Sequence, residues 1–169
     1  LAACRKHGTI LVFDEVITGF RLHPGGAQAL FGVTPDMSIF AKAIANGFPV
    51  AALVGRADLL DRVSSGVLHG GTFNSQPVTM AAMVATQQAL TPEHYETTGK
   101  LGLRLQNGIR DILAESGIPA IVQGFPLMFH VGFGLTAPSR NYRDVARRDH
   151  ARYVRFAFAL LQRGVRILE

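Results

Sequence analysis

The sequence is poor in cysteine: it contains one, Cys4, and no group of cysteine and histidine residues with the spacing of a zinc site. A single cysteine cannot form a disulfide within the chain, so a disulfide framework is excluded and a reducing compartment, the cytoplasm, is expected. Long apolar runs are also absent, because no uninterrupted stretch approaches the roughly 20 residues that cross a bilayer. We therefore expect a cytoplasmic protein with neither a metal nor a membrane partner.

Charged residues are few and nearly balanced. The 17 lysines and arginines against 12 aspartates and glutamates give a net charge of +5 with histidine neutral. This excess can favour an anionic ligand but is far from that of a nucleic-acid-binding tail, so no nucleic-acid partner is expected. The six histidines have neither a metal spacing nor a nucleophile partner.

The chain also lacks an initiator methionine. It starts at Leu1, and its last residues, 165–168, have a strand-like pattern with no closing helix after them. The 169 residues are 48% apolar, which is enough for one sizeable core or for parts of two domains. We expect a chain truncated at both ends.

The first half contains short apolar runs rich in β-branched residues, a pattern typical of strands buried on both faces of a parallel sheet. These runs occupy residues 9–13, 37–41 and 50–54. A glycine loop at 70–77 then leads into an apolar helix expected over 78–90, with Asn74 or Ser75 available as its N-terminal cap. The alternation of strands and helices predicts the α/β class.

The second half indicates a smaller α/β lobe. Thr91-Pro92 breaks the helical pattern, so we place a domain boundary after residue 91. The elements expected beyond it are a helix over 93–116, strands over 118–122 and 127–133, and a helix over 143–163. The arginines of the last helix are expected to form a solvated face, with nearby aspartates within pairing distance.

Two residues stand where ligands collect in open parallel sheets, beyond the carboxyl ends of strands. Asp14 follows the first apolar run, and Lys42 follows the second. Lys42 is the one lysine of three that lies in apolar sequence. Burial there would favour the neutral amine, which can attack an aldehyde. The alternative is a strand-end lysine that reaches solvent along its own stem.

Asp14 suits a second role in the same chemistry. An aspartate at a neighbouring strand end can pair with a protonated pyridine nitrogen and so keep an aldehyde cofactor electron-accepting. The alternative is a cap for the following turn. The glycine loop adds backbone N–H groups and the hydroxyls of Thr72 and Ser75, which suit a phosphate at a helix start, although such loops commonly bind nothing.

Taken together, four segments resemble class III aminotransferases, which depend on pyridoxal phosphate (PLP), and within them the glutamate-1-semialdehyde aminomutase-like branch. These segments are FDEV at 13–16, TGFR at 18–21, GVTPD at 32–36 and AKAIANGFPV at 41–50. The resemblance is strong to about residue 90 and only general beyond it. It implies part of the large PLP-binding domain of a fold type I transferase over 1–91, and part of its small C-terminal α/β lobe over 92–169.

The resemblance also implies roles for individual residues. Lys42 forms the Schiff base (internal aldimine) with PLP, Asp14 pairs with the pyridine nitrogen, and Val16 packs on the ring face. Thr72 donates to the cofactor phosphate of the partner subunit, which implies a homodimer. From the residues alone, Val16 could equally be core. We interpret Glu15 as structural. The family's upstream phosphate loop and ring-stacking aromatic would precede Leu1.

The implied reaction is amino-group transfer between a small amino donor and a keto or aldehyde acceptor, with Lys42 also moving the proton. A transaminase and an aminomutase would use the same residues. A rival hypothesis is a nucleotide hydrolase, since an apolar strand ending in Asp14-Glu15 is also typical of a Walker B element, but no GxxxxGK[ST] loop is present. A second rival is a truncated, non-catalytic interaction module.

Overall fold

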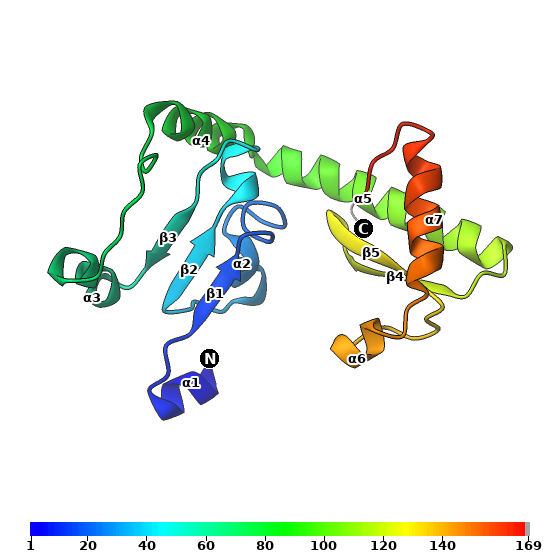
Figure 1. The fold of residues 1–169 in the computed structure, drawn as a ribbon, viewed down its shortest axis with the longest axis horizontal. Coiled ribbons are helices and arrows are strands. Elements are labelled where there is room, and N and C mark those ends of the chain that lie inside the picture. The colour runs from blue at the N-terminus through cyan, green and yellow to red at the C-terminus, as the bar shows by residue number, and fades with distance from the viewer. Residues whose placement is uncertain (168–169) are drawn as a thin grey trace. The chain divides into compact units, whose positions relative to one another are not determined.

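The chain forms two compact units, Leu1–Glu96 and Thr97–Glu169, each with its own sheet and apolar core. The computed structural model describes residues 1–167 (Figure 1). Its mixture of helices and strands confirms the predicted α/β class. The division between the units falls inside helix α5 (Pro92–Glu115). The assignment of 1–91 and 92–169 to a large and a small domain stays a prediction.

The sheet of the first unit has three strands in the order β1-β2-β3. β1 (Val12–Glu15) and β2 (Met37–Phe40) are parallel, and β3 (Ala52–Gly55) runs antiparallel to β2. In the parallel pair, Glu15 lies opposite Phe40. The carboxyl ends of β1 and β2 therefore meet at one edge of the sheet.

Short helices connect these strands. α2 (Gly26–Phe31) lies between β1 and β2, the 3-10 helix η1 (Lys42–Ala45) follows β2 directly, and α4 (Pro77–Ala89) packs against η1. The remaining helices of the unit are α1 (Ala2–His7), α3 (Ala57–Leu60) and the 3-10 helix η2 (Asp61–Ser65). α1 and α2 end at glycines in the left-handed conformation, Gly8 and Gly32, as helices commonly do.

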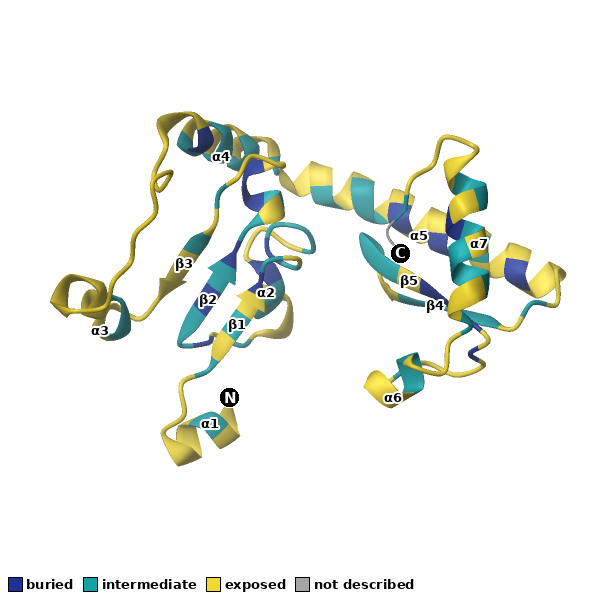
Figure 2. Ribbon diagram, in the orientation of Figure 1, coloured by how far each residue is buried: buried dark blue, intermediate teal, exposed yellow. Residues whose placement is uncertain are grey.

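The core of the first unit lies where β2 passes into η1. Phe40, Ile44 and Ala45 are buried there. Figure 2 shows dark blue segments in β2 and in the turn that follows it. The rings of Phe20 and Phe40 pack with their centroids 5.3 Å apart, and Met83 of α4 covers the cluster. The core thus holds the backbone on either side of Lys42.

The second unit is a β-hairpin packed against helices. β4 (Ala120–Phe125) and β5 (Met128–Phe133) pair in antiparallel, and the helices are α5, α6 (Tyr142–Val145) and α7 (His150–Leu161). Leu113, Val131 and Phe133 form its core. On α5, the buried side chain of Gln106 donates to the carbonyl of Phe125 at 2.9 Å, which fixes the helix against the hairpin turn.

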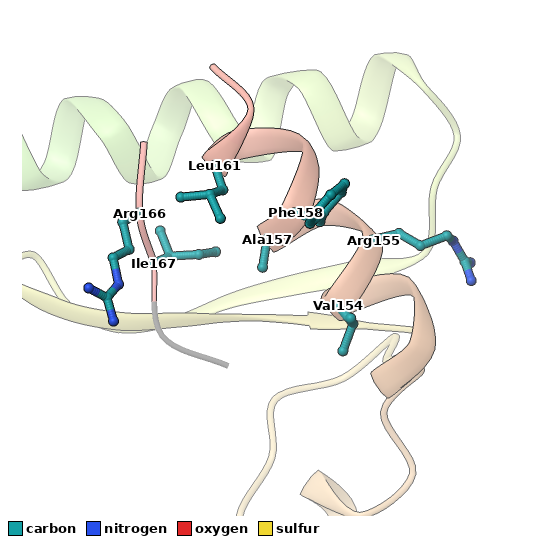
Figure 3. A pocket seen from close by; sticks show the side chains of 7 residues that line it. All are labelled: Val154, Arg155, Ala157, Phe158, Leu161, Arg166 and Ile167. Atoms are coloured by element: carbon teal, nitrogen blue, oxygen red, sulfur yellow. The ribbon is translucent and has the colours of Figure 1, made fainter. Parts of the chain in front are cut away.

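An apolar pocket of about 430 Å³ lies beside α7 in the second unit. Figure 3 shows Leu161 and Ala157 of the helix together with Ile167 of the following segment at this pocket, while Arg155 extends away from the others. Among the described residues that line it, Arg155 and Arg166 are the charged ones and the other five are apolar.

The structure corrects several expected strands. β1 includes Asp14 and Glu15 instead of ending before them. The sheet is not wholly parallel, because β3 is antiparallel, and β1 is not buried on both faces, because Val12 is 46% exposed. The strand-like pattern at the end of the chain forms no strand over residues 165–167, and Leu168 lies outside the described residues.

Two expectations about helices are also wrong. α4 is capped by Gln76 without a side-chain hydrogen bond, not by Asn74 or Ser75, and Thr79 is its one buried residue. The helix expected over 143–163 is interrupted, because the Asp149 carboxylate accepts from the backbone N–H of Arg152 at 2.9 Å and begins α7 as a separate helix. An N-terminal cap of this kind favours a new helix start over continuation.

A buried carboxylate joins β1 to α2. The side chain of Glu15 is 1% exposed and is the largest fully buried side chain among the described residues. It accepts hydrogen bonds from the backbone N–H groups of Ala27 and Gln28, at 2.5 and 3.1 Å, in the first turn of α2. The Gln28 amide and the Thr18 hydroxyl also donate to it, at 3.3 and 3.0 Å. Burying a charge is tolerated when it is hydrogen-bonded in this way.

A second carboxylate holds the opposite end of the same two strands. Asp36, just before β2, accepts from the backbone N–H of Leu11 at 2.8 Å and from the Arg56 guanidinium at 2.9 Å. These two contacts, the Leu11 N–H first, hold the pKa of Asp36 below its ordinary value. Arg56 also makes a two-pronged contact with Asp58, which lowers the pKa of that carboxyl as well.

We predict that Gly26→Ala destabilises the first unit by about 2–4 kcal/mol, because the residue has φ +67 and a Cβ would overlap the Glu15 carboxylate, lying 2.7 Å from Oε1. Gly32→Ala is the matched control: Gly32 has φ +63 with nothing near a Cβ, so only the backbone cost of about 1–2 kcal/mol applies. Urea unfolding measures both. Equal losses for the two variants would contradict a role for the Glu15 contact.

We also predict an acid-sensitive contribution from Asp36. Because its folded-state pKa is lowered, its stabilisation is present above the ordinary value of 3.8 and is lost as the pH falls below that value through the folded pKa. Asp36→Asn should therefore lower stability at neutral pH and reduce the further loss on acidification. Unfolding curves from pH 6 downward test this, and an unchanged acid dependence in the variant would refute it.

Candidate active site

Asp14 lies near the carboxyl end of β1 with its side chain exposed. Its Oδ1 accepts a hydrogen bond from the backbone N–H of Val16 at 3.1 Å. In the described part of the chain its Oδ2 has no partner. The carboxylate is thus held by one oxygen and presents the other to solvent.

Lys42 is the first residue of η1, and Ala41 alone separates it from the end of β2. Its side chain is exposed, and its amino group makes no hydrogen bond or ion pair with residues 1–167. The expected burial of Lys42 is therefore wrong for this chain. The physical reason is that the tight 3-10 turn directs Ile44 and Ala45 into the core and leaves Lys42 on the outer side.

The structure places Asp14 and Lys42 at one edge of the sheet. β1 and β2 are neighbours and parallel, so residues at and just beyond their carboxyl ends share that edge. Val16 follows β1 directly and is half-buried. Sequence analysis thus identified three residues that come together at one sheet edge.

The turn that carries Lys42 is held through its backbone. The Gln87 side chain of α4 donates to the carbonyl of Ile44 at 2.9 Å. Lys42 and Asn46 have φ values of 46° and 47°, which is a left-handed backbone conformation. Residues other than glycine adopt it at a cost of order 1 kcal/mol each. Such strain persists where surrounding contacts over-determine it, as the buried Ile44 does here.

Thr72 is not brought to this edge. Its loop lies between η2 and α4, and Figure 1 shows this segment passing beyond β3, on the side away from β1. Thr72 is exposed. Ser75 and His69 of the same loop line a pocket of about 680 Å³ with residues of β3 and α4.

Sequence reasoning missed one supporting side chain, Gln87, and assigned a structural role to another, Glu15, without identifying its contacts. Gln87 lies in an apolar helix with nothing in its spacing to mark it. Glu15 had a usable signal, because successive residues of a strand point to opposite faces, so Asp14 and Glu15 cannot share one environment. The buried Glu15 agrees with our structural interpretation of that residue.

Other kinds of site find no support in residues 1–167. No group of three or more histidine, cysteine, aspartate or glutamate side chains in this range is arranged to hold a metal ion. None of the helices in the described part of the chain is long and apolar enough to cross a membrane.

Comparison with known proteins gives consistent matches. A glutamate-1-semialdehyde 2,1-aminomutase from Clostridium kluyveri is 35% identical over 168 residues, which are 97% of this chain and 40% of the relative. An omega-transaminase structure from Sphaerobacter thermophilus has a TM-score of 0.88 and 36% identity, over 98% of this chain and 39% of that one. The structure of a glutamate-1-semialdehyde aminomutase from Pseudomonas aeruginosa in complex with PMP has a TM-score of 0.86 and 26% identity, with the same coverage.

The chain therefore spans about 40% of the length of the curated relative and of these solved structures. The neighbours confirm the expected relation to PLP-dependent transferases. The family match covers residues 1–169, so the likeness to this family continues beyond residue 90. Because the aminotransferase class-III family model matches residues 1–169, the chain belongs to the class-III aminotransferase family.

Proposed function

We propose that this chain supplies the lysine and the aspartate of a PLP-dependent site for amino-group transfer. The observation that carries the proposal is the placement of Lys42 and Asp14 at the carboxyl ends of adjacent parallel strands. Each presents an atom without a partner in the described chain: the Lys42 amino group and Asp14 Oδ2. These two groups suit a ligand that has an aldehyde at one position and a cationic ring nitrogen at another.

Each residue then has a distinct task. The Lys42 amino group would hold PLP through its aldehyde carbon, with the carbonyl oxygen leaving as water, and when displaced by the amine of the substrate it would carry a proton to and from the substrate carbon. Asp14 Oδ2 would hold the proton on the pyridine nitrogen, and Val16 would pack against the ring. PLP, when bound, provides an electron-accepting ring that stabilises negative charge on the substrate carbon.

The exposure of both side chains bears on what the chain can do by itself. A solvent-open lysine and aspartate leave water at the reacting atoms, whereas amino transfer favours a site from which water is excluded. The chain spans about 40% of its curated relatives, and we propose that upstream segments supply the phosphate loop and the ring-stacking aromatic that cover the site. We further propose a cytoplasmic homodimer in which Thr72 donates to the partner subunit's cofactor phosphate.

For the reaction itself, we propose transamination between an amino donor and a keto or aldehyde acceptor, with glutamate-1-semialdehyde 2,1-aminomutase activity as the alternative. The names of the omega-transaminase and the aminomutase relatives support one reaction each. The two differ in whether the ketone product leaves before the amino group returns. Product formation without a separate acceptor therefore favours the aminomutase, and dependence on an added keto acid favours the transaminase.

The nucleotide-hydrolase hypothesis is not supported. The whole chain matches the class-III aminotransferase family, and its solved neighbours are transaminases and aminomutases. Asp14 and Glu15 also point into different environments, one exposed and one buried under hydrogen bonds, which does not suit a shared magnesium site.

We predict that incubation with PLP followed by borohydride reduction places the adduct on Lys42. Lys42→Ala should abolish both the adduct and its absorbance band, because no other amine among residues 1–167 lies at the sheet edge. Lys6→Ala is the control, since Lys6 is an exposed lysine of α1, and it should leave the band intact. Peptide mapping locates the adduct.

A chain extended upstream of Leu1 should be tested in parallel, because the 169-residue chain leaves the site open. Modification of the extended chain at Lys6 or Lys100 in place of Lys42 would overturn the proposal. Absence of any adduct in the extended chain would also overturn it.

We predict that Asp14→Asn weakens PLP binding about 10- to 100-fold, the loss of one charge-assisted hydrogen bond, and slows proton removal from the substrate while the lysine adduct still forms. Asp111→Asn, an exposed aspartate of α5 in the second unit, is the control and should change neither quantity. Fluorescence titration and single-turnover rates measure the two effects. Unchanged rates in Asp14→Asn would rule out the pyridinium role.

A further inference from the structure

Glu15 makes hydrogen bonds to the turn 16–19, which lies beside the candidate site. The backbone carbonyl of Glu15 accepts from the N–H of Gly19 at 2.9 Å, and this bond closes the turn that carries Val16. Its side chain accepts from the Thr18 hydroxyl at 3.0 Å in the same turn. Residue 15 therefore holds the turn 16–19 through its main chain and its side chain together.

The turn 16–19 also fixes the orientation of the Asp14 side chain. The N–H of Val16 donates to Asp14 Oδ1 at 3.1 Å, so the position of the turn sets which carboxylate oxygen is engaged and which is left free. A displacement of the turn would break this bond and release the Asp14 side chain to rotate in solvent. The path from Glu15 to Asp14 Oδ2 runs through Thr18 and Val16.

The geometry of the Glu15 site is directional. Four donors converge on two carboxylate oxygens, from the turn on one side and from the first turn of α2 on the other. An apolar side chain of similar size could fill the same space without defining an orientation. Because the Glu15 side chain is 1% exposed, water cannot substitute for a lost donor at no cost.

We propose that Glu15 is a positioning residue for amino transfer: its buried carboxylate fixes the turn 16–19 so that Val16 holds Asp14 with Oδ2 directed toward the cofactor's ring nitrogen. This inference rests on the proposed function for the identity of the ligand. The coupling from Glu15 to Asp14 is a property of the chain alone and can be measured without cofactor.

The principal variant is Thr18→Val, which removes one donor to Glu15 and changes the shape of the side chain little. Glu15→Gln is the more severe variant, because it places an amide N–H against the N–H groups of α2, and it is informative only if it folds. Thr79→Val is the matched control. Thr79 is buried in α4 and donates to the carbonyl of Gln76 at 2.8 Å, away from β1.

The first readout is amide hydrogen exchange of Val16 by NMR in the cofactor-free chain. We expect Thr18→Val to speed exchange at Val16 about tenfold, the effect of losing roughly one hydrogen bond, and Thr79→Val to leave it unchanged despite a comparable fall in melting temperature. Equal exchange rates at Val16 in both variants would reduce Glu15 to a stabilising residue and overturn the inference.

The second readout is the affinity for PLP and the pH dependence of the absorbance band, measured on the chain extended upstream of Leu1. We expect Thr18→Val to weaken PLP binding about three- to tenfold and to shift the pH dependence in the same direction as Asp14→Asn, whereas Thr79→Val does neither. A band and affinity identical in Thr18→Val and Thr79→Val would overturn the inference.

The two readouts separate this inference from the proposed function. If the chain extended upstream of Leu1 binds no PLP, the proposed function fails, and with it the ligand assigned to Asp14. The exchange rates would then still decide whether Glu15 fixes Asp14.

Discussion

A carboxylate buried under four hydrogen bonds determines the layout of the first unit. Glu15 satisfies the opening N–H groups of α2, which otherwise have no partner within the helix, and it thereby sets where the strand stops and where the helix starts. α2 leads directly to β2, so the same contact fixes the crossover that brings Lys42 beside Asp14. A charged group in the interior destabilises a fold unless it is paired or hydrogen-bonded. Here four hydrogen bonds to Glu15 offset that cost and fix the connection between β1 and α2.

The chemistry that we propose at the sheet edge requires a restrained backbone and side chains that are free to move. Ile44 and Ala45 are buried and the carbonyl of Ile44 is bound by Gln87, so the main chain around Lys42 is held while its amino group is not. Asp14 follows the same principle, with one oxygen engaged and one free. In the function that we propose, Lys42 needs a fixed backbone and a mobile amino group, because that group has to bond to the cofactor, be released and move a proton.

The sequence pattern predicted which residues lie at the edge of the sheet, but it did not predict the strand directions or which side chains are buried. The apolar runs at 9–13 and 37–41, which Asp14 and Lys42 follow, were enough to predict that both residues lie at one edge of the sheet, because parallel strands share their carboxyl ends. Nothing in a four-residue strand such as β3 states its direction, so the antiparallel pairing was missed. Lys42 was expected to be buried because its sequence neighbours are apolar, yet a 3-10 turn buries only some of them. The helical periodicity over 143–163 is uninterrupted, so one helix was predicted there. The N-terminal cap that Asp149 forms with Arg152 instead begins a separate helix, α7.

The edge position of β1 has a practical consequence for handling the protein. Among the described residues β1 pairs with β2 alone, and its approach carries Ile10 and Val12 at 50% and 46% exposure. A strand edge with free N–H and C=O groups and apolar side chains is a template for pairing with another chain. β3, at the far side of the same sheet, exposes Leu53 and Val54 in a similar way. The isolated chain is therefore expected to self-associate as its concentration rises, and its solution behaviour is best studied dilute.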